Sequence, residues 1–482
     1  MLKKELTFAL NYALNKGFQI HPDAFKILEN IDVKKLEKII KEIVREKTRQ
    51  KLFLINQDDL ETYLGIKEDL NLKSEHRILS DPTSKITTGE GVKGYNALFS
   101  SRFNKLKRII FDRPESRMLK SIASVKSVKT EDDMYVCGLV TTRNTERNIV
   151  KLVLEDPSGT FEGIVFDSEL QKVAGSLLSD QFVMARISMG KNSGFIIKDL
   201  ILPDIPEQAI NRSETETFAV FLSDLHIGSK YFMEKEFSEF VSWISSPDPT
   251  ARKVRFVLIG GDVVDGVGIY PNQDKELVFQ TLEEQLRRLE ELLDKIPKHV
   301  KIFIMPGNHD PGRRALPQPA IPKKYNNGLW ERENVFMVGN PTMISLNGVK
   351  VLMFHGQSID DIVKTTPGLS YDNPANVMKH LLKARHLSPI YGSQTPIAPE
   401  MEDLMVIDEI PDIFHVGHVH RAQLDMYKGI LLINSGSWQR QTPFQASVGM
   451  TPNPGIALMV NLKTFQVFHE NYNSNLDNIL QS

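Results

Sequence analysis

The sequence predicts a multidomain α/β protein: a large domain of buried strands in the C-terminal half, a β-barrel before it and a small helical domain first. Three observations predict this order. Apolar residues recur at helical spacing near the N-terminus, they alternate with polar residues between 135 and 203, and six short apolar runs lie between 218 and 437. We expect the helical domain at 1–70, a linker with a basic helical segment at 71–130, the barrel at 131–205 and the large domain at 206–482.

Composition limits the classes of function. The chain has 482 residues, a formal net charge of −2 and one cysteine, Cys137. A near-neutral charge gives no overall reason to bind nucleic acid, so any DNA contact must come from local patches. One cysteine excludes a disulfide framework. We find neither an apolar stretch long enough for a bilayer nor a signal-peptide pattern, and therefore expect a cytoplasmic protein without a membrane segment.

The N-terminal segment has three predicted helices. Apolar residues from Leu6 to Leu14 keep helical spacing, and Gly17 offers a stop. His21-Pro22 opens a second helix, and a third begins near Val33 with one apolar and one lysine-rich face. We interpret the lysine-rich face as solvated rather than DNA-binding, because glutamates are interspersed with the lysines.

The next stretch is polar and then basic. Residues 73–90 are rich in Pro, Gly, Ser and Thr, which predicts a linker. Residues 102–129 contain nine Lys or Arg residues against Asp112 and Glu115. Neutralisation of DNA phosphates and a solvated helix face explain this basic window equally well.

Period-two alternation then predicts five strands and one helix. The strands are expected at 135–141, 148–156, 160–166, 181–188 and 194–202, with a helix at 168–178. Five strands with a helix after the third is the order of an OB-fold barrel, which often binds oligonucleotides. The few aromatic residues on these strands serve a core equally well, so we favour a packing role for this barrel.

The six apolar runs predict strands buried on both faces, since they are rich in Val, Ile and Phe and lack strict alternation. In such sheets the ligand-binding crevice lies beyond the carboxyl ends of the strands. The runs end in polar turns that contain, in order, Asp224 and His226, Asp262 and Asp265, Asn308 with His309 and Asp310, His355, His418 and His420, and Asn434.

These side chains form a predicted metal-ligand set. Carboxylate, amide and imidazole ligands without thiolate suit Mn²⁺, Fe or Zn²⁺ better than Mg²⁺ or Ca²⁺. Seven of them are too many for one tetrahedral ion: Asp224, His226, Asp262, Asn308, His355, His418 and His420. They suit two ions roughly 3.5 to 4 Å apart, an arrangement that holds both the attacking and leaving oxygens of a phosphoester.

The segments DLH, GDVVD, GNHD, HG and GHVH, in this order between about 217 and 465, resemble the calcineurin-like metallophosphoesterases. DLHIGS, NSGSWQRQTPFQ and the upstream domains further resemble the small subunits of archaeal family D DNA polymerases, relatives of the eukaryotic polymerase B subunits. The resemblance implies a β-sandwich flanked by helices, with a helical N-terminal module for protein contact. Because all the metal ligands are retained, it also implies an active 3′–5′ exonuclease suited to proofreading.

We expect Asp224, His226 and His420 to hold one ion, Asn308, His355 and His418 the other, and Asp262 to bridge them. Mn²⁺ is the most favoured metal, with Fe or Zn²⁺ as alternatives. The family pattern implies that His309 is the general acid and that Asp265 pairs with it, fixing its tautomer and raising its pKa. We assign Asp310 a supporting role, and His380, His386, His415 and His469 structural ones.

The resemblance implies a large catalytic polymerase subunit as partner and single-stranded or mismatched DNA 3′ ends as substrate. Contacts to the partner are expected on the outer faces of the large domain and the C-terminal stretch. Two alternatives remain: a non-catalytic assembly subunit, or a metallophosphatase acting on nucleotides or phosphoproteins. The Pro-rich segment at 315–324 is expected to shape the substrate entrance, with Arg313, Arg314, Lys323 and Lys324 as possible phosphate contacts.

Overall fold

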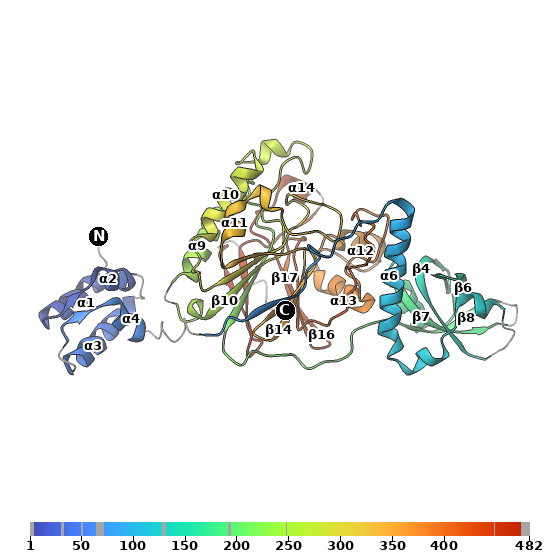
Figure 1. Cartoon of the computed structure of the whole chain (residues 1–482), viewed down its shortest axis with the longest axis horizontal. Helices are drawn as coiled ribbons and strands as arrows, with labels where there is room; N and C mark the ends of the chain where they lie inside the picture. Colours follow the sequence, from blue (N-terminus) through green and yellow to red (C-terminus); the bar gives the residue numbers. More distant parts are fainter. Residues whose placement is uncertain are drawn as a thin grey trace.

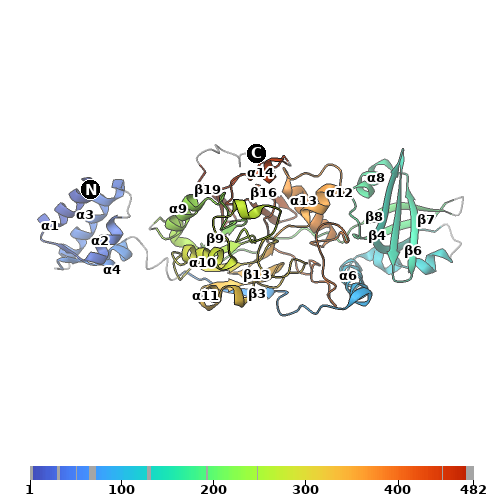
Figure 2. The same ribbon diagram turned by 90° about the horizontal axis from the view of Figure 1, so that it is seen from above.

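The computed structural model describes residues 4–29, 33–49, 52–63, 72–127, 132–190, 194–246, 248–447 and 449–473. Figure 1 shows the N-terminal helices at one end, the barrel at the other and a two-sheet domain between them, and Figure 2 gives the same order from above. The predicted boundaries near 70 and 130, and the last residues of the C-terminal stretch, lie outside the described residues.

The N-terminal module is helical, as predicted. Its helices and its short parallel strand pair are α1 (Lys4–Asn15), β1 (Gln19–Ile20), α2 (Pro22–Glu29), α3 (Val33–Arg49), β2 (Leu54–Ile55) and α4 (Gln57–Tyr63). The apolar stripes of these helices meet in one small core around Phe18, Leu28 and Ile40. The α3 stripe is buried, and Lys38 and Lys41 are exposed, whereas Lys47 is buried and forms an ion pair with Asp59.

A closed five-stranded barrel follows, also as predicted. Its strands pair in the order β4-β5-β6-β8-β7. The elements are β4 (Met134–Glu146), β5 (Ile149–Asp156), β6 (Gly159–Val165), α8 (Ser168–Gly175), β7 (Phe182–Met189) and β8 (Phe195–Ile201). Alternate strand residues such as Val136, Leu152 and Phe161 fill the interior. Closure leaves no free strand edge.

Two six-stranded sheets face each other in the central domain. The first has the order β12-β11-β10-β9-β18-β19 and the second β16-β17-β15-β14-β13-β3. The first sheet's strands are β9 (Phe218–Leu222), β10 (Val254–Ile259), β11 (Lys301–Ile304), β12 (Val335–Met337), β18 (Ile456–Asn461) and β19 (Val467–Asn471). The second sheet's are β3 (His76–Ser80), β13 (Thr342–Leu346), β14 (Val349–Phe354), β15 (Ile413–Val416), β16 (Ala422–Tyr427) and β17 (Ile430–Ser435).

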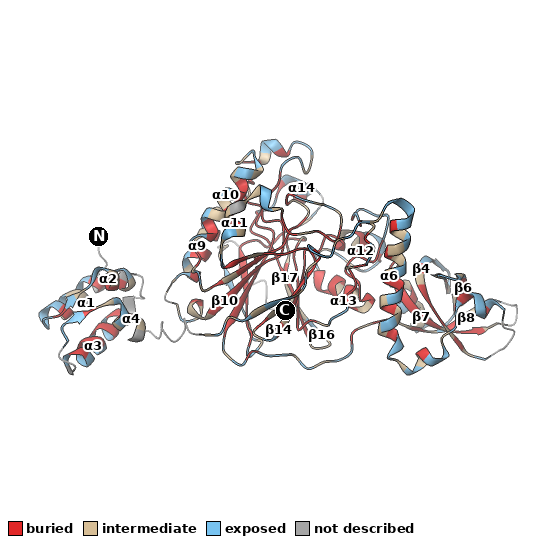
Figure 3. Ribbon diagram, viewed as in Figure 1, coloured by how far each residue is buried: buried red, intermediate tan, exposed pale blue. Residues whose placement is uncertain are grey.

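Apolar side chains from both sheets form one core between them, including Phe221, Phe256, Phe303, Met353 and Ile433. Helices α9 (Glu234–Ile244), α10 (Leu282–Leu293) and α11 (Asn327–Glu331) cover the outer face of the first sheet. Helices α12 (Ile359–Thr365) and α13 (Pro374–Ala384) cover that of the second. Burial on both faces, visible in Figure 3, explains why the strand runs lack alternation.

Two predicted elements differ in the structure. The predicted linker at 73–90 contains β3, which pairs antiparallel with β13 and completes the second sheet. Its polar sequence fits an edge strand with little burial. The sequence from Asp274 to Ile296 also predicts one long amphipathic helix, but in the structure the helix begins only at Leu282, because Thr281 forms a capping box with Glu284.

Helix α6 (Gly91–Phe111) joins the barrel to the central domain, and it contains the start of the basic window. Arg102 is fully buried, and its Nε donates to Asp403 Oδ2 at 2.8 Å. His386 Nε2 lies 3.0 Å from the same oxygen, while Lys105 pairs with Glu402 and Asp408. Arg102 and Lys105 both pair with carboxylates of the central domain. For these two residues, neither predicted explanation of the basic window, DNA phosphate neutralisation or a solvated helix face, holds.

The structure also bears on two expectations from composition. Cys137 lies on β4 and is buried between the barrel and α6, where burial raises the pKa of its thiol to about 12. Within the described part of the chain, no helix is both long enough and apolar enough to cross a membrane.

Replacing Arg102 by Ala should destabilise the fold strongly, since it leaves a fully buried carboxylate without its cation. We expect a loss of about 3–5 kcal/mol, measured as a shift of the urea unfolding transition. Arg108→Ala, on the same helix, is the control. Arg108 is 74% exposed and lies 3.7 Å from Asp408, so its loss should cost under about 1 kcal/mol. Equal losses in the two variants would contradict the role of Arg102.

His386 predicts a pH dependence of stability. Burial lowers the pKa of His386 from 6.5 to about 4. Between these values the unfolded chain binds a proton that the folded chain does not, so stability should fall as pH drops from 6.5 to 4, by roughly 1.4 kcal/mol per pH unit. His386→Gln keeps a donor for Asp403 and should remove this part of the slope. Identical pH profiles by urea denaturation would refute it.

Candidate metal centre

All the predicted site residues lie at the carboxyl ends of parallel strands. Asp224 and His226 follow β9, Asp262 follows β10 and Asn308 follows β11 of the first sheet. His355 follows β14, and His418 and His420 follow β15 of the second sheet. The core between the sheets brings the two strand edges together, so side chains separated by up to 196 positions converge.

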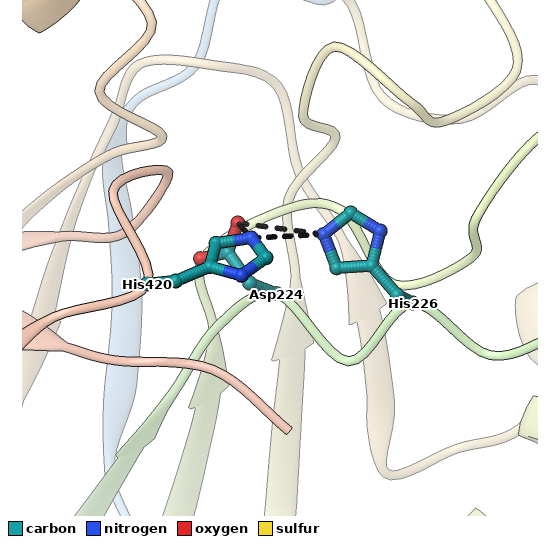
Figure 4. A group of neighbouring side chains, drawn as sticks. All are labelled: Asp224, His226 and His420. Atoms are coloured by element: carbon teal, nitrogen blue, oxygen red, sulfur yellow. Dashed lines mark hydrogen bonds and ion pairs between the residues drawn. The ribbon is translucent and has the colours of Figure 1, made fainter. Parts of the chain in front are cut away.

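Asp224, His226 and His420 form the first group (Figure 4). Asp224 Oδ1 lies 3.5 Å from His420 Nε2 and 4.0 Å from His226 Nε2, and the two imidazole nitrogens are 3.1 Å apart. All three side chains are buried, and Asp224 Oδ1 has no hydrogen-bond partner. A buried carboxylate oxygen facing two imidazole nitrogens fits a transition-metal ion.

Asp262, His355 and His418 form the second group, and Asn308 joins it. His355 Nε2 lies 3.3 Å from Asp262 Oδ2 and 3.0 Å from Asn308 Oδ1. The same Asp262 oxygen is 3.9 Å from His226 Nε2 in the first group. Asp262 therefore lies between two donor sets, in the position expected of a bridging carboxylate.

Each of three histidine rings is oriented by a hydrogen-bond partner at the ring nitrogen that faces away from the centre. His355 Nδ1 lies 2.9 Å from the Gly260 carbonyl, and His226 Nδ1 lies 3.1 Å from Asp265 Oδ1, so each Nε2 faces the site. His418 is held the other way round, with Nε2 at 3.1 Å from Asp360 Oδ2, which leaves Nδ1 for the centre. Such partners fix the tautomer and orientation of histidine ligands.

The expected pairing of Asp265 with His309 is wrong. The Asp265 carboxylate faces His226 and accepts from the side-chain amides of Gln439 and Gln273, at 3.0 and 2.8 Å. His309 Nδ1 instead lies 2.8 Å from the Asp265 main-chain carbonyl. Burial lowers the pKa of His309 despite the nearby carboxylates, whereas we expected a raised value.

The site concentrates negative charge. Burial alone would lower the pKa of His226 and His355, but neighbouring carboxylates raise them to about 9 and about 10. Against the same cost of burial, the surrounding histidines hold the pKa of Asp262 well below its usual value. A field that stabilises imidazolium ions stabilises metal cations at the same place, and binding a metal displaces those protons.

Asp310 supports the centre, as we assigned from the sequence. Its carboxylate accepts from the main-chain N–H groups of Val263, Val264 and Gly307, at 2.8 to 3.2 Å. These bonds join the turn after β10 to the turn after β11, which contains Asn308 and His309. Burial and the charge of Asp262 raise the pKa of Asp310.

The turns that present the ligands have strained backbones. Asp224, His226, Asp262, His418 and His420 all have positive φ, between 50° and 70°. For residues other than glycine this conformation costs on the order of 1 kcal/mol each. Gly261, at φ +99°, has a different reason: a Cβ there would lie 2.5 Å from His355 Nδ1. The backbone is therefore arranged for the side chains of the site.

A cavity of about 520 Å³ opens over the centre. It exposes several residues that the sequence reasoning missed, of which Asp360, Gln439 and Gln445 contact predicted ligands or Asp265. Gln439 and Gln445 lie in NSGSWQRQTPFQ, which carried the resemblance without a residue-level role. Of the other histidines, His415 turns into the inter-sheet core against Phe221, and its Nε2 lies 3.0 Å from Ser435 Oγ.

The basic side chains of the Pro-rich region have different surroundings in the structure. Arg313 forms an ion pair with the buried Glu400 at 2.5 Å and is therefore structural. Lys323 lies 3.7 Å from Glu331 in an exposed pair. Arg314 is exposed and lines a second cavity of about 300 Å³, which shares Asn308, Asp360 and His418 with the first.

The fold and the site together define a class of protein. Its members have a two-sheet α/β domain, and acidic and histidine clusters able to hold metal ions lie at the facing strand edges. The family model for the B subunits of DNA polymerases alpha and epsilon matches residues 219–424. The DNA polymerase II small subunit of Archaeoglobus fulgidus is 39% identical over 385 residues, covering 79% of this chain and 77% of the relative. That of Pyrococcus horikoshii is 36% identical over 417 residues, covering 83% and 67%.

The chain therefore belongs to the archaeal DNA polymerase II small subunits, the family D small subunits that the sequence resembles. Among solved structures, one described as a novel archaeal phosphodiesterase is 12% identical, covers 53% of this chain and 99% of its own, and has a TM-score of 0.28.

The two ligand groups predict the stoichiometry of metal binding. The wild-type chain should bind two Mn²⁺ ions, Asp224→Ala should bind one, and Asp262→Ala should bind both far more weakly, because Asp262 faces both groups. Calorimetry and metal analysis after gel filtration measure this. Asp274→Ala removes an exposed acid outside the site and should leave two ions bound. Identical stoichiometry in Asp262→Ala and the wild type would contradict a bridging role.

Proposed function

We propose that this chain is the nuclease subunit of an archaeal replicative DNA polymerase, a metal-dependent 3′–5′ exonuclease that removes nucleotides from single-stranded or mismatched 3′ ends. The position of Asp262 between two donor sets is the observation that carries the proposal, because a phosphodiesterase with two metal ions needs a shared ligand. Membership of a polymerase small-subunit family supports DNA as the substrate.

The fold supports this assignment. We interpret the two-sheet domain as a calcineurin-like phosphoesterase sandwich, since its ligands follow β9, β10, β11, β14 and β15 in the order of the motifs. We interpret the barrel as an OB-fold module that packs against the nuclease domain. Arg143 of β4 supports that role, because its guanidinium donates to the Thr365 carbonyl of the central domain at 3.1 Å.

Two divalent ions, most favourably Mn²⁺, would be held by Asp224, His226 and His420 and by Asn308, His355 and His418, with Asp262 shared. When bound, the ions would lower the pKa of the attacking water and stabilise charge on the phosphate oxygens. The mixed donor set and the unpartnered Asp224 Oδ1 fit such ions.

His309 is the proposed general acid. Its Nδ1 donates to the Asp265 carbonyl, so Nε2 is the atom left to give a proton to the leaving 3′ oxygen. The main-chain N–H of His309 donates to Asp262 Oδ1 at 2.8 Å, which fixes the position of the proposed acid relative to the shared carboxylate. Asp265 has an indirect role, since it fixes His226 with its carboxylate and His309 with its carbonyl.

Two cations that line the cavities are the proposed contacts to DNA phosphates. Lys364 lines the main cavity with its amine bonded to Gln394, and exposed Arg314 lines the adjoining one. Each lysine or arginine that neutralises a phosphate releases a counterion and strengthens binding at low salt. A large catalytic subunit is the proposed protein partner, consistent with the name of the relatives as small subunits.

His309→Ala should abolish Mn²⁺-dependent release of nucleotides from 5′-labelled single-stranded or 3′-mismatched DNA, by about 10²-fold or more, because proton transfer to the leaving oxygen is lost. His469→Ala removes an exposed histidine on β19 and should leave the rate unchanged. The assay is done on the chain alone and with its large subunit, and the 5′ label shows the direction of cleavage.

Other outcomes would replace the proposal. A chain that binds no metal, and whose effect on DNA is the same with and without His309, would be a non-catalytic assembly subunit. A chain that hydrolyses nucleotide monoesters well and DNA poorly would be a phosphatase.

A further inference from the structure

The cavity over the candidate metal centre is lined by two kinds of residue. One kind is the ligands, among them Asp262, Asn308 and His418. The other kind is aromatic and apolar and comes from three separate segments, Ile269 and Tyr270, Tyr371, and Phe444 with Met450; we call its three rings the aromatic wall. None of the three tyrosine and phenylalanine rings has a role in holding metal or in the proposed proton transfer.

The two tyrosines of this wall have fixed positions. Tyr270 donates from its hydroxyl to Glu276 Oε2 at 3.1 Å, and its ring centroid lies 6.4 Å from that of His309. Tyr371 is hydrogen-bonded to Asp360, the carboxylate that holds His418, and burial with this neighbouring charge raises the pKa of Tyr371. Both hydroxyls are thus used by the protein, so what the rings offer a ligand is their apolar surface.

Phe444 is the outermost ring. It is 64% exposed, although burying a side chain of this size is worth about 1.5–3 kcal/mol. It lies on α14 (Pro443–Ser447), whose start is fixed by reciprocal bonds between Thr442 and Gln445. The Gln445 amide also lies 2.9 Å from His420 Nδ1. The exposed ring is therefore presented by a segment tied to a metal ligand.

We infer that this aromatic wall, defined by Tyr270, Tyr371 and Phe444, stacks the unpaired nucleobase of the nucleotide whose phosphate lies over the metal centre. The inference rests on the proposed function and names the base subsite of the same site. In the proposed function the phosphate lies over the metal ions that the ligands would hold, and the base is the flat apolar part of a nucleotide. The cavity volume is in the usual range for small-molecule sites.

This subsite also explains substrate choice. Aromatic side chains stack every base in a sequence-tolerant way, but only a base released from its partner can offer its face to them. A paired 3′ end keeps its terminal base stacked in the duplex, whereas a mismatched or single-stranded end frees it at little cost. Stacking in the cavity therefore selects the ends that proofreading must remove.

The test compares two single-stranded oligonucleotides that differ only in the 3′-terminal residue, thymidine or an abasic nucleotide. With the wild-type chain and Mn²⁺, we expect the abasic end to have about tenfold lower kcat/KM, mainly through a higher KM. Phe444→Ala should lower kcat/KM about tenfold for the thymidine end and little for the abasic end. Phe111→Ala, a ring 54% exposed on α6 and outside the cavity, should preserve the wild-type ratio.

A binding measurement gives a second readout. An oligonucleotide ending in 3′-2-aminopurine should lose fluorescence on binding to the uncleaving His309→Ala chain, because stacking quenches it, and should lose much less when Phe444→Ala is added. Failure of the wild type to release nucleotides from any end would overturn the proposed function itself. Wild-type cleavage at the same rate with and without the terminal base would overturn only the stacking site. A Phe444→Ala defect that is equal for both ends would also overturn only the stacking site, and it would point to a protein partner on this ring.

Discussion

The site depends on the close approach of two buried carboxylates of the first sheet, Asp224 and Asp262, to histidines of the second. Asp224 Oδ1 lies 3.5 Å from His420 Nε2, and Asp262 Oδ2 lies 3.3 Å from His355 Nε2. The inter-sheet core sets this approach, because Phe221 and Leu258 on the first sheet pack against Met353 and Ile433 on the second. Uncompensated charges at full burial are costly. The surrounding histidines supply compensation, because, against the cost of burial, the carboxylates raise the pKa of His226 and His355.

The local backbone follows from the same constraint. Five ligand residues adopt positive φ, and Gly261 leaves no room for a Cβ beside His355. Conformations of this kind persist only where the surroundings fix them. Asp310 fixes two of the turns by accepting three main-chain hydrogen bonds. The main-chain N–H of His418 donates to Asp224 Oδ2 at 2.8 Å, and this bond fixes a turn of one sheet against a turn of the other.

Much of the fold and of the ligand grouping could be predicted, because each rests on a local signal. Apolar runs without alternation mark doubly buried strands, and polar residues just after them reach the carboxyl edge. The partner of Asp265 could not be predicted in this way. Asp265 lies three residues after Asp262, in a turn where Asp262 has positive φ. The path of that turn decides whether the carboxylate or the main-chain carbonyl of Asp265 contacts His309.

Charge patterns were the least informative signal. Arg102 belongs to the most basic window of the chain, yet its partner Asp403 lies 301 positions later and only the tertiary fold joins them. The polar residues before α6 gave the same difficulty, since β3 has the composition of a linker and becomes a strand only because the edge of β13 is available to it. In both places a long-range contact decides what local sequence leaves open.

The placement of aromatic rings separates the roles of the two β domains. In the barrel, Phe161 and Phe182 are buried, and among its described phenylalanines only Phe166 is mainly exposed. A barrel that binds single strands needs several exposed rings along its surface. Tyr270, Tyr371 and Phe444 line the cavity over the candidate metal centre instead, and Phe444 is 64% exposed. The proposed recognition of the base and the proposed cleavage of its phosphate would thus fall to one domain, while α6 and its buried Arg102 join the barrel to that domain.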